Sequence, residues 1–244
     1  MYQGFASMYD ALMHDAPYEV WAAYIDGFLA EWFKKPRAEI LVLDLACGTG
    51  NITLLLADMG YDLIGVDVSE DMLAEANRKA YEQNAKILFL AQDMQELNLY
   101  GTVDAAISVC DGFSYILEED DLLTAFKRVR LFLNPDGVFI FDMNTEYKFK
   151  ELFSNKILEG SGIDGEGYEW QNDFDEKTGI NEYRITFFSE KEEPFEELHR
   201  QRAYSPTVIT NLLIEAGFSS VKIRDGYSND PLTPESARVV FIAD

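Results

Sequence analysis

The sequence predicts an α/β protein with a doubly wound, Rossmann-like sheet of seven mostly parallel strands. A C-terminal antiparallel hairpin and a small antiparallel β insertion are expected to complete it. Short apolar runs alternate with segments of helical periodicity over residues 40–141, and a glycine-rich turn joins the first run to its helix. Such alternation is typical of βαβ units, whose right-handed crossovers place helices on both faces of a sheet. After residue 144 the pattern changes to short alternating segments, which predict the insertion.

The core elements can be assigned one after another. Residues 18–34 carry apolar side chains at helical spacing, and Pro36 ends that helix. Residues 40–45 are apolar except for one acid, as in a parallel strand buried on both faces. Ser69 is the expected N-cap of the helix that follows the second strand. Further strands are expected over residues 62–67, 87–91, 103–109 and 138–141, helices over 52–59, 70–81 and 122–133, and a turn over 134–137.

The last third of the chain is expected to form the insertion first and then a helix and two strands of the core. Segments between residues 167 and 204 alternate, with a hairpin turn at 177–179. Pro206 then opens a helix that runs to Ala216, and Gly217 ends it. Two final strands are expected at 218–224 and 238–243. The predicted organisation is an N-terminal helical region over 1–36, a core of 37–146 plus 205–244, and an insertion over 147–204.

Composition and charge narrow the class of partner. The net charge of −24 would repel a phosphate backbone, so nucleic-acid and anionic-membrane partners are disfavoured. The densest basic cluster, at residues 127–130, reads as a solvated helix face. Apolar runs are too short to span a bilayer, and the first residues lack the pattern of a secretory signal. The two cysteines have no metal-ligand spacing, so we expect no metal site. With only two cysteines, a reduced, cytoplasmic protein is favoured over one with a disulfide. A monomer or a homodimer is expected.

The strongest functional signal is the turn within residues 42–50. Gly48 and Gly50 allow a tight backbone turn and close approach to a ligand, and the next helix offers unpaired N–H groups. Asp67 ends the next predicted strand, where an acid can accept hydrogen bonds from both hydroxyls of a ribose. The third glycine of a dinucleotide fingerprint is replaced by Thr53. Together these residues predict a site for a ribose-bearing cofactor.

These residues, with three later segments, resemble the class I S-adenosylmethionine-dependent methyltransferases. The ordered segments that carry the resemblance are residues 44–50, 65–72, 91–94, 104–109 and 133–139. The resemblance covers residues 38–144 well and the C-terminal tail, residues 205–243, moderately. The resemblance implies S-adenosylmethionine as cofactor and a small-molecule methyl acceptor, with the N-terminal helical region as a cap and the insertion as a lid over the substrate.

The resemblance also implies roles for individual residues. Gly48 and Gly50 would line the methionine moiety, Asp44 would help to hold its amino group, and Asp67 would bind the ribose. Tyr9 would close over the cofactor, as would Tyr2 and Trp21, although core packing is the other reading of Trp21. The remaining cofactor residues would be Ala46, Val68, Met72 on the adenine face, Asp93 and Met94 on the adenine edge, and Cys110 beside the sulfonium. Met72 and Cys110 also fit an ordinary buried position.

The catalytic residues are not determined by the sequence. Candidate bases are His199, Tyr115 and Asp111, and a structural role is the alternative for His199. Tyr204 is a further candidate for the pocket, and Arg200 and Arg202 are either ligands of an acidic substrate or surface charges. Residues 110–113 do not read Asn-Pro-Pro-Tyr, which marks members that methylate amide or adenine amino groups. Three alternatives stay open: a tRNA-nucleoside methyltransferase, a nucleotide-dependent oxidoreductase, and a non-catalytic cofactor-binding module.

Overall fold

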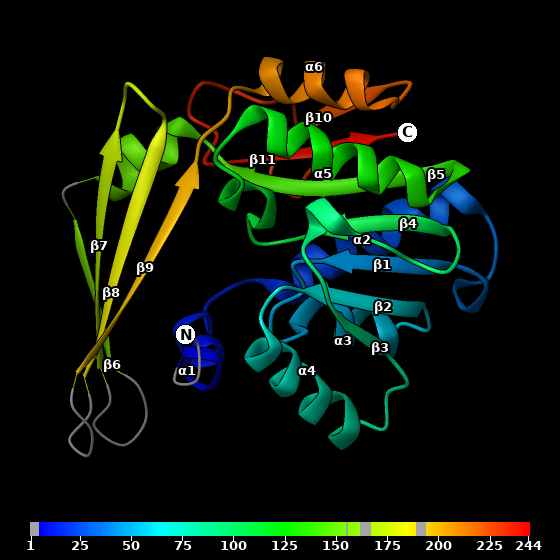
Figure 1. Cartoon of the computed structure of the whole chain (residues 1–244), viewed down its shortest axis with the longest axis horizontal. Coiled ribbons are helices and arrows are strands. Elements are labelled where there is room, and N and C mark those ends of the chain that lie inside the picture. The colour runs from blue at the N-terminus through cyan, green and yellow to red at the C-terminus, as the bar shows by residue number, and fades with distance from the viewer. Residues whose placement is uncertain (1–4, 155, 162–166, 189–193) are drawn as a thin grey trace.

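The computed structural model describes residues 5–154, 156–161, 167–188 and 194–244. Its core is a seven-stranded sheet in the order β10-β11-β5-β4-β1-β2-β3 (Figure 1). The strands are parallel except for β11, which runs antiparallel to both β5 and β10. The fold class predicted from the sequence is therefore confirmed. The strands are β1 Leu41–Leu45, β2 Asp62–Asp67, β3 Leu88–Ala91, β4 Val103–Ser108, β5 Leu133–Asn144, β10 Val221–Asp225 and β11 Arg238–Ala243.

Helices cover both faces of this sheet because its central strands are apolar on both sides. Val42 of β1 packs in a cluster with residues of α2 and α3, whereas Leu43 and Leu45 pack in a second cluster with α5 and α6. No helix in the described ranges is long and apolar enough to cross a membrane. The helices are α1 Phe5–Leu12, α2 Tyr18–Phe33, α3 Asn51–Asp58, α4 Glu70–Glu82, α5 Glu119–Phe132 and α6 Pro206–Ala216. Short turns of helix are η1 Arg37–Glu39, η2 Met94–Glu96, η3 Gly112–Tyr115 and η4 Lys148–Phe153.

Local signals set the helix ends as the sequence predicts. The Ser69 side chain accepts a hydrogen bond from the Met72 N–H and caps α4. Gly217 ends α6 with a φ of 102°, in the left-handed region that glycine adopts freely. The α5 helix begins earlier than expected, at Glu119, since three acids occupy its first turn and favour the positive end of the helix dipole.

The expected turn at residues 134–137 is wrong. β5 begins at Leu133, which leaves α5 directly in an extended conformation and pairs with Val103 of β4. The register then shifts between Val103 and Ala105, so the segment is an irregular start of a strand. Pro135 is tolerated there because it lies exposed, where no ladder hydrogen bond is lost.

The insertion forms a second sheet of four antiparallel strands between β5 and α6. Its strands are β6 Ile157–Ser161, β7 Gly167–Asp175, β8 Ile180–Phe188 and β9 Phe195–Arg202. The hairpin turn expected at 177–179 joins β7 to β8, whereas the sequence pattern did not reveal β6. The sheet stands beside the core, and α1 lies between it and α4 (Figure 1). Ala6 of α1, Met72 of α4 and Phe187 of β8 share one buried cluster, so α1 connects the two sheets.

Candidate active site

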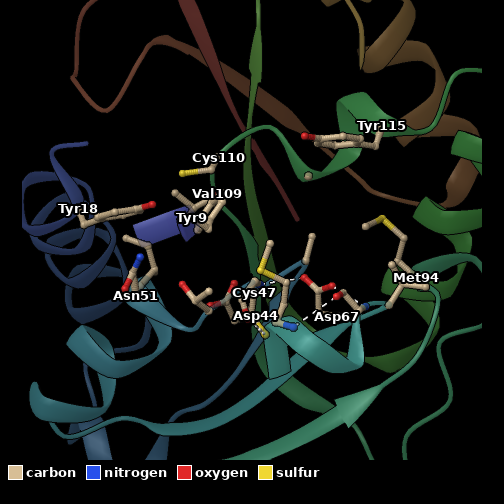
Figure 2. Close-up of a pocket in the computed structure, with 18 of the residues that line it drawn as sticks. Tyr9, Tyr18, Asp44, Cys47, Asn51, Asp67, Met94, Val109, Cys110 and Tyr115 are labelled. Carbon is tan, nitrogen blue, oxygen red and sulfur yellow. Dashed lines mark hydrogen bonds between the residues drawn. The ribbon is translucent and has the colours of Figure 1, made fainter. Parts of the chain in front are cut away.

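A cavity of about 240 Å³ lies at the carboxyl ends of β1, β2 and β4 (Figure 2). Its floor is the glycine turn after β1, and its walls come from α1, α2, η3 and β9. A second cavity of about 260 Å³ adjoins it and shares Ala46, Asp67 and Met94 with it. Cavities at this edge are the usual ligand sites of doubly wound sheets, because the loops after parallel strands converge there.

The two glycines of the turn have different surroundings: one faces open space, and the other is closely packed against α4. Gly48 has a φ of 54°, and a Cβ added to it would meet no atom within 4 Å, so its backbone faces open space. Gly50 has a φ of 78°, and a Cβ there would lie 3.1 Å from the Cβ of Ala76 in α4. One glycine therefore exposes backbone to a ligand, while the other lets α3 and α4 pack together.

Asp67 ends β2 and joins the two loops that form the cavity floor. Its carboxylate accepts hydrogen bonds from the Gly48 N–H at 2.8 Å and the Ser69 N–H at 2.9 Å. Burial raises the pKa of Asp67 above its ordinary value, although these hydrogen bonds act in the opposite direction and lower the pKa. Each carboxylate oxygen has further lone pairs, so the group can still accept hydrogen bonds from a ligand in the cavity.

Asp44 is the most deeply buried acid of the cavity. Its side chain accepts a hydrogen bond from Thr53 Oγ1 at 2.6 Å, and the residue is 2% exposed. Burial raises the pKa of Asp44 to about 7, and the nearby charge of Asp67 adds to the effect. Thr53 stands where a dinucleotide fingerprint has its third glycine, and its hydroxyl gives Asp44 a partner. The departure from that fingerprint thus has a physical reason.

Helix α1 is held against the core through Asp10, a residue that the sequence did not point to. Its carboxylate accepts hydrogen bonds from Thr49 Oγ1 at 2.6 Å, Asn51 Nδ2 at 2.9 Å and Lys79 Nζ at 2.8 Å. Burial opposes ionisation of Asp10, but these hydrogen bonds outweigh it and lower its pKa. The four residues, which we call the α1 latch, hold Tyr9 over the glycine turn.

The loop after β4 holds two residues in a conformation that is costly for side chains other than glycine. Cys110 and Asp111 each have a φ of 66°. Asp111 accepts hydrogen bonds from both terminal nitrogens of Arg238, at 3.0 and 3.2 Å, and from Asn144 Nδ2 at 2.8 Å. Arg238 also contacts the carboxylate of Asp142. Asp111 is thereby committed to an internal ion pair, and its role is to fix the loop that carries Cys110.

Comparison with known proteins assigns the family. Residues 42–137 match the methyltransferase-domain family. YqeM of Bacillus subtilis, a protein assigned as a methyltransferase, is 35% identical over 249 residues, covering 100% of this chain and 96% of that protein. The chain belongs to the S-adenosylmethionine-dependent methyltransferases. The carboxy-S-adenosyl-L-methionine synthase of Campylobacter concisus is 33% identical over 183 residues, covering 74% of this chain and 70% of that protein.

The fold of this methyltransferase agrees with the assignment over its whole length. A crystal structure of an S-adenosylmethionine-dependent methyltransferase from Clostridium acetobutylicum superimposes with a TM-score of 0.85 and 31% identity. The match covers 100% of this chain and 98% of the other. S-adenosylmethionine is therefore the cofactor, and the residues of the cavity fit it. The open face of Gly48 leaves room for a ligand, while Asp44 and Asp67 offer carboxylates to its amino and hydroxyl groups.

The structure brings most of the predicted cofactor residues of the methyltransferase to one cavity. Asp93 lines only the adjoining cavity, and Gly50 packs behind the turn. Tyr2 lies outside the described residues. Trp21 stacks on Tyr227 with ring centroids 5.4 Å apart, in keeping with core packing. The predicted residues that line the main cavity are Tyr9, Asp44, Ala46, Gly48, Asp67, Val68, Met72, Met94 and Cys110.

Two of the three candidate bases also line the cavity. His199 reaches it from β9 and Tyr115 from η3, and their rings meet edge to face at 5.9 Å. Tyr204 is buried elsewhere, where its hydroxyl donates to the Ile116 carbonyl at 2.8 Å. Arg202 donates to the Leu117 carbonyl at 2.7 Å, so it braces the loop after η3. Arg200 is exposed, opposite Glu182 on β8.

Sequence reasoning gave no site role to four polar lining residues, Tyr18, Thr49, Asn51 and Ser69. Asn51 is the first residue of α3, directly after the glycine turn, and that position was a usable signal. Tyr18 was read only as the start of a helix. Its approach to the cavity depends on how α2 packs, which the local pattern does not reveal.

Proposed function

We propose that this methyltransferase transfers the methyl group of S-adenosylmethionine to a small molecule held within the cavity. The observation that carries the proposal is enclosure, because Tyr9 of α1 and His199 of the insertion line the same cavity as the glycine turn. Region 1–36 then acts as a cap and region 147–204 as a substrate lid on the core of 37–146 and 205–244. A nucleic-acid acceptor would instead need a basic surface, which the net charge of −24 opposes.

The proposed cofactor roles divide the lining residues among the parts of S-adenosylmethionine. In this proposal Gly48 and Asp44 hold the methionine end, and Asp67 accepts from the ribose hydroxyls. Tyr9 closes over the cofactor, because the α1 latch fixes its helix above the turn. The remaining roles are those of Met72, Met94 and Asp93 around the adenine, Ala46 and Val68 in the loops, and Cys110 beside the sulfur.

The chain contributes alignment and the exclusion of water. Bound S-adenosylmethionine supplies a methyl group on a positively charged sulfur, which a nucleophile displaces in line without a covalent protein intermediate. Residues of the glycine turn fix the donor, and the walls from η3 and β9 confine the acceptor on the opposite side. Holding both partners in a reactive geometry can supply much of the rate acceleration. The α1 latch keeps the cavity closed to water during the reaction.

The proposal is tested first by calorimetric titration with S-adenosylmethionine, using NAD and NADP as controls. Binding of S-adenosylmethionine alone is expected, followed by release of S-adenosylhomocysteine when small-molecule acceptors are added. Release only with tRNA would overturn the small-molecule acceptor. Binding without any release would favour a non-catalytic module. We also propose a cytoplasmic location, because Cys47 and Cys110 carry free thiols. Light scattering would distinguish a monomer from a homodimer.

A further inference from the structure

The described lining of the active-site cavity contains two acids and no lysine or arginine. Asp44 and Asp67 lie on its floor, and its other lining residues are polar, aromatic or apolar. Nearby cations are committed elsewhere: Arg238 pairs with Asp111, and Lys79 pairs with Asp10. An acceptor with a carboxylate or phosphate would lose its water here without gaining a counter-charge, which is costly. The cavity therefore selects against anionic acceptors.

The part of the cavity away from the glycine turn is aromatic. Figure 2 draws Tyr18 and Tyr115 on the opposite side of the cavity from Asp44 and Asp67. The faces of aromatic rings carry partial negative charge and attract cations, most strongly where water is excluded. The net charge of −24 also raises the concentration of cations near the protein. These features favour an acceptor that is positively charged in solution.

His199 is the group best placed to accept a proton in this part of the cavity. It lies on β9, opposite Tyr183 of β8, and is 7% exposed. Burial lowers the pKa of His199, so the imidazole is neutral at pH 7 and has a nitrogen that can take up a proton. Gln201, two positions along the strand, accepts a hydrogen bond from the Tyr183 hydroxyl at 2.7 Å and fixes the strand. The titratable groups that share the cavity with it are Tyr9, Tyr18, Tyr115, Cys47, Cys110, Asp44 and Asp67.

Building on the proposed function, we propose that the methyl acceptor is a primary or secondary amine without a carboxylate or phosphate, and that His199 takes its proton. A ring nitrogen of His199 first takes a proton from the bound ammonium group, which frees the lone pair of the amine nitrogen. This lone pair forms the new N–C bond while the C–S bond of the sulfonium breaks. The electron pair of that bond stays on sulfur, which becomes a neutral thioether. His199 then passes its proton to water, and the product leaves as a methylated ammonium ion, so charge and atoms balance.

Matched pairs of probes test the class of acceptor. Tyramine and tyrosine differ by a carboxylate, and ethanolamine and phosphoethanolamine differ by a phosphate. Calorimetric titration of the S-adenosylhomocysteine complex is expected to show each amine binding at least about tenfold more tightly than its anionic partner, a ratio that corresponds to roughly 1.4 kcal/mol. Equal or tighter binding of the anionic partner, or no binding of either amine, would overturn the proposal. Failure of S-adenosylmethionine itself to bind would instead overturn the proposed function.

The variant His199→Asn tests the proton acceptor. The rate of tyramine methylation should fall about 100-fold, the lower end of the range for general bases, and the acid limb of the pH–rate profile should disappear. The affinity for S-adenosylmethionine should not change. Arg200→Asn, one position along the strand and exposed, is the matched control and should keep the wild-type rate. A reduced rate with an unchanged pH profile, or no loss of rate, would show that His199 is not the base.

Discussion

Replacing Asp44 by Asn should stabilise the cofactor-free protein and weaken its binding of S-adenosylmethionine. The carboxyl group is buried at the end of β1, and its pKa rises to about 7 from an ordinary value of 3.8. The folded protein therefore holds this proton more tightly than the unfolded chain. The stability contributed by the protonated group is complete below pH 3.8 and is lost as the pH rises to about 7.

The size of the effect follows from the two pKa values. A difference of about 3 pH units at roughly 1.4 kcal/mol each gives ~4 kcal/mol of unfolding free energy lost by pH 8. Asn carries no charge, and Thr53 can still donate to its amide oxygen at this position. The amide NH₂ lacks a partner among the described residues around Asp44, which costs about 1–3 kcal/mol. The net stabilisation at pH 8 is therefore about 1–3 kcal/mol.

Urea unfolding of the wild type and Asp44→Asn at pH 5 and pH 8 measures this directly. The difference between the two proteins should grow by about 2–3 kcal/mol from pH 5 to pH 8. Asp26→Asn is a control of opposite sign, since Arg37 lowers the pKa of Asp26. The stability that Asp26 contributes is present at pH 8 and is lost on acidification. Parallel pH dependences for the wild type and Asp44→Asn would refute the reasoning.

Three further substitutions test other parts of the site. Asp67→Ala should raise the Kd for S-adenosylmethionine about 10- to 100-fold in calorimetry, because hydrogen bonds to a charged group are lost. The control Asp62→Ala, at the exposed start of the same strand, should leave the Kd unchanged. Lys79→Met should open the α1 latch and speed dissociation of S-adenosylmethionine in stopped-flow measurements about 3- to 10-fold, whereas the exposed Lys86→Met should have no effect. Gly112→Ala should lower the unfolding free energy by about 1–3 kcal/mol, because its Cβ would lie 2.6 Å from Ser108 Oγ; Gly101→Ala has open space and should be neutral.

The sequence predicted those features that depend on neighbouring residues. The strand at 62–67 and the helix from Pro206 to Ala216 have their predicted limits, because apolar spacing and capping residues are local. The glycine turn could be recognised for the same reason. The turn expected at 134–137 failed because the flanking residues Leu133 and Val138 pair with β4 and hold the segment between them within β5, against the local preference of Asn, Pro and Gly for turns. Strand β6 was missed because it is defined by its antiparallel pairing with β7, which the local sequence pattern does not reveal.

The cofactor end and the acceptor end of the cavity differ in how much the sequence could reveal. Residues after β1 and β2 reach the cavity through the geometry of a parallel sheet, so Asp44, Gly48 and Asp67 could be placed from their position alone. The α1 latch could not, because Asp10 and Lys79 meet only when α1 packs on α4. For Asp111, the position after β4 predicted a place near the site, but the ion pair with Arg238 could not be predicted from the sequence.

The proposed acceptor end of the cavity is formed largely by elements outside the core sheet. The acceptor end combines α1, α2, η3 and β9, and these elements are joined by packing rather than by the core sheet. Phe187 and Ile185 of β8 pack in the same cluster as Ala6 of α1, which carries Tyr9 in the next turn of the helix. A change of volume in that cluster would therefore move Tyr9 relative to His199, and it would also shift Met72, which belongs to the cluster and lines the cavity. Under the proposed function, apolar substitutions remote from the reacting atoms would thus alter acceptor choice together with the contacts that Tyr9 and Met72 make with the cofactor.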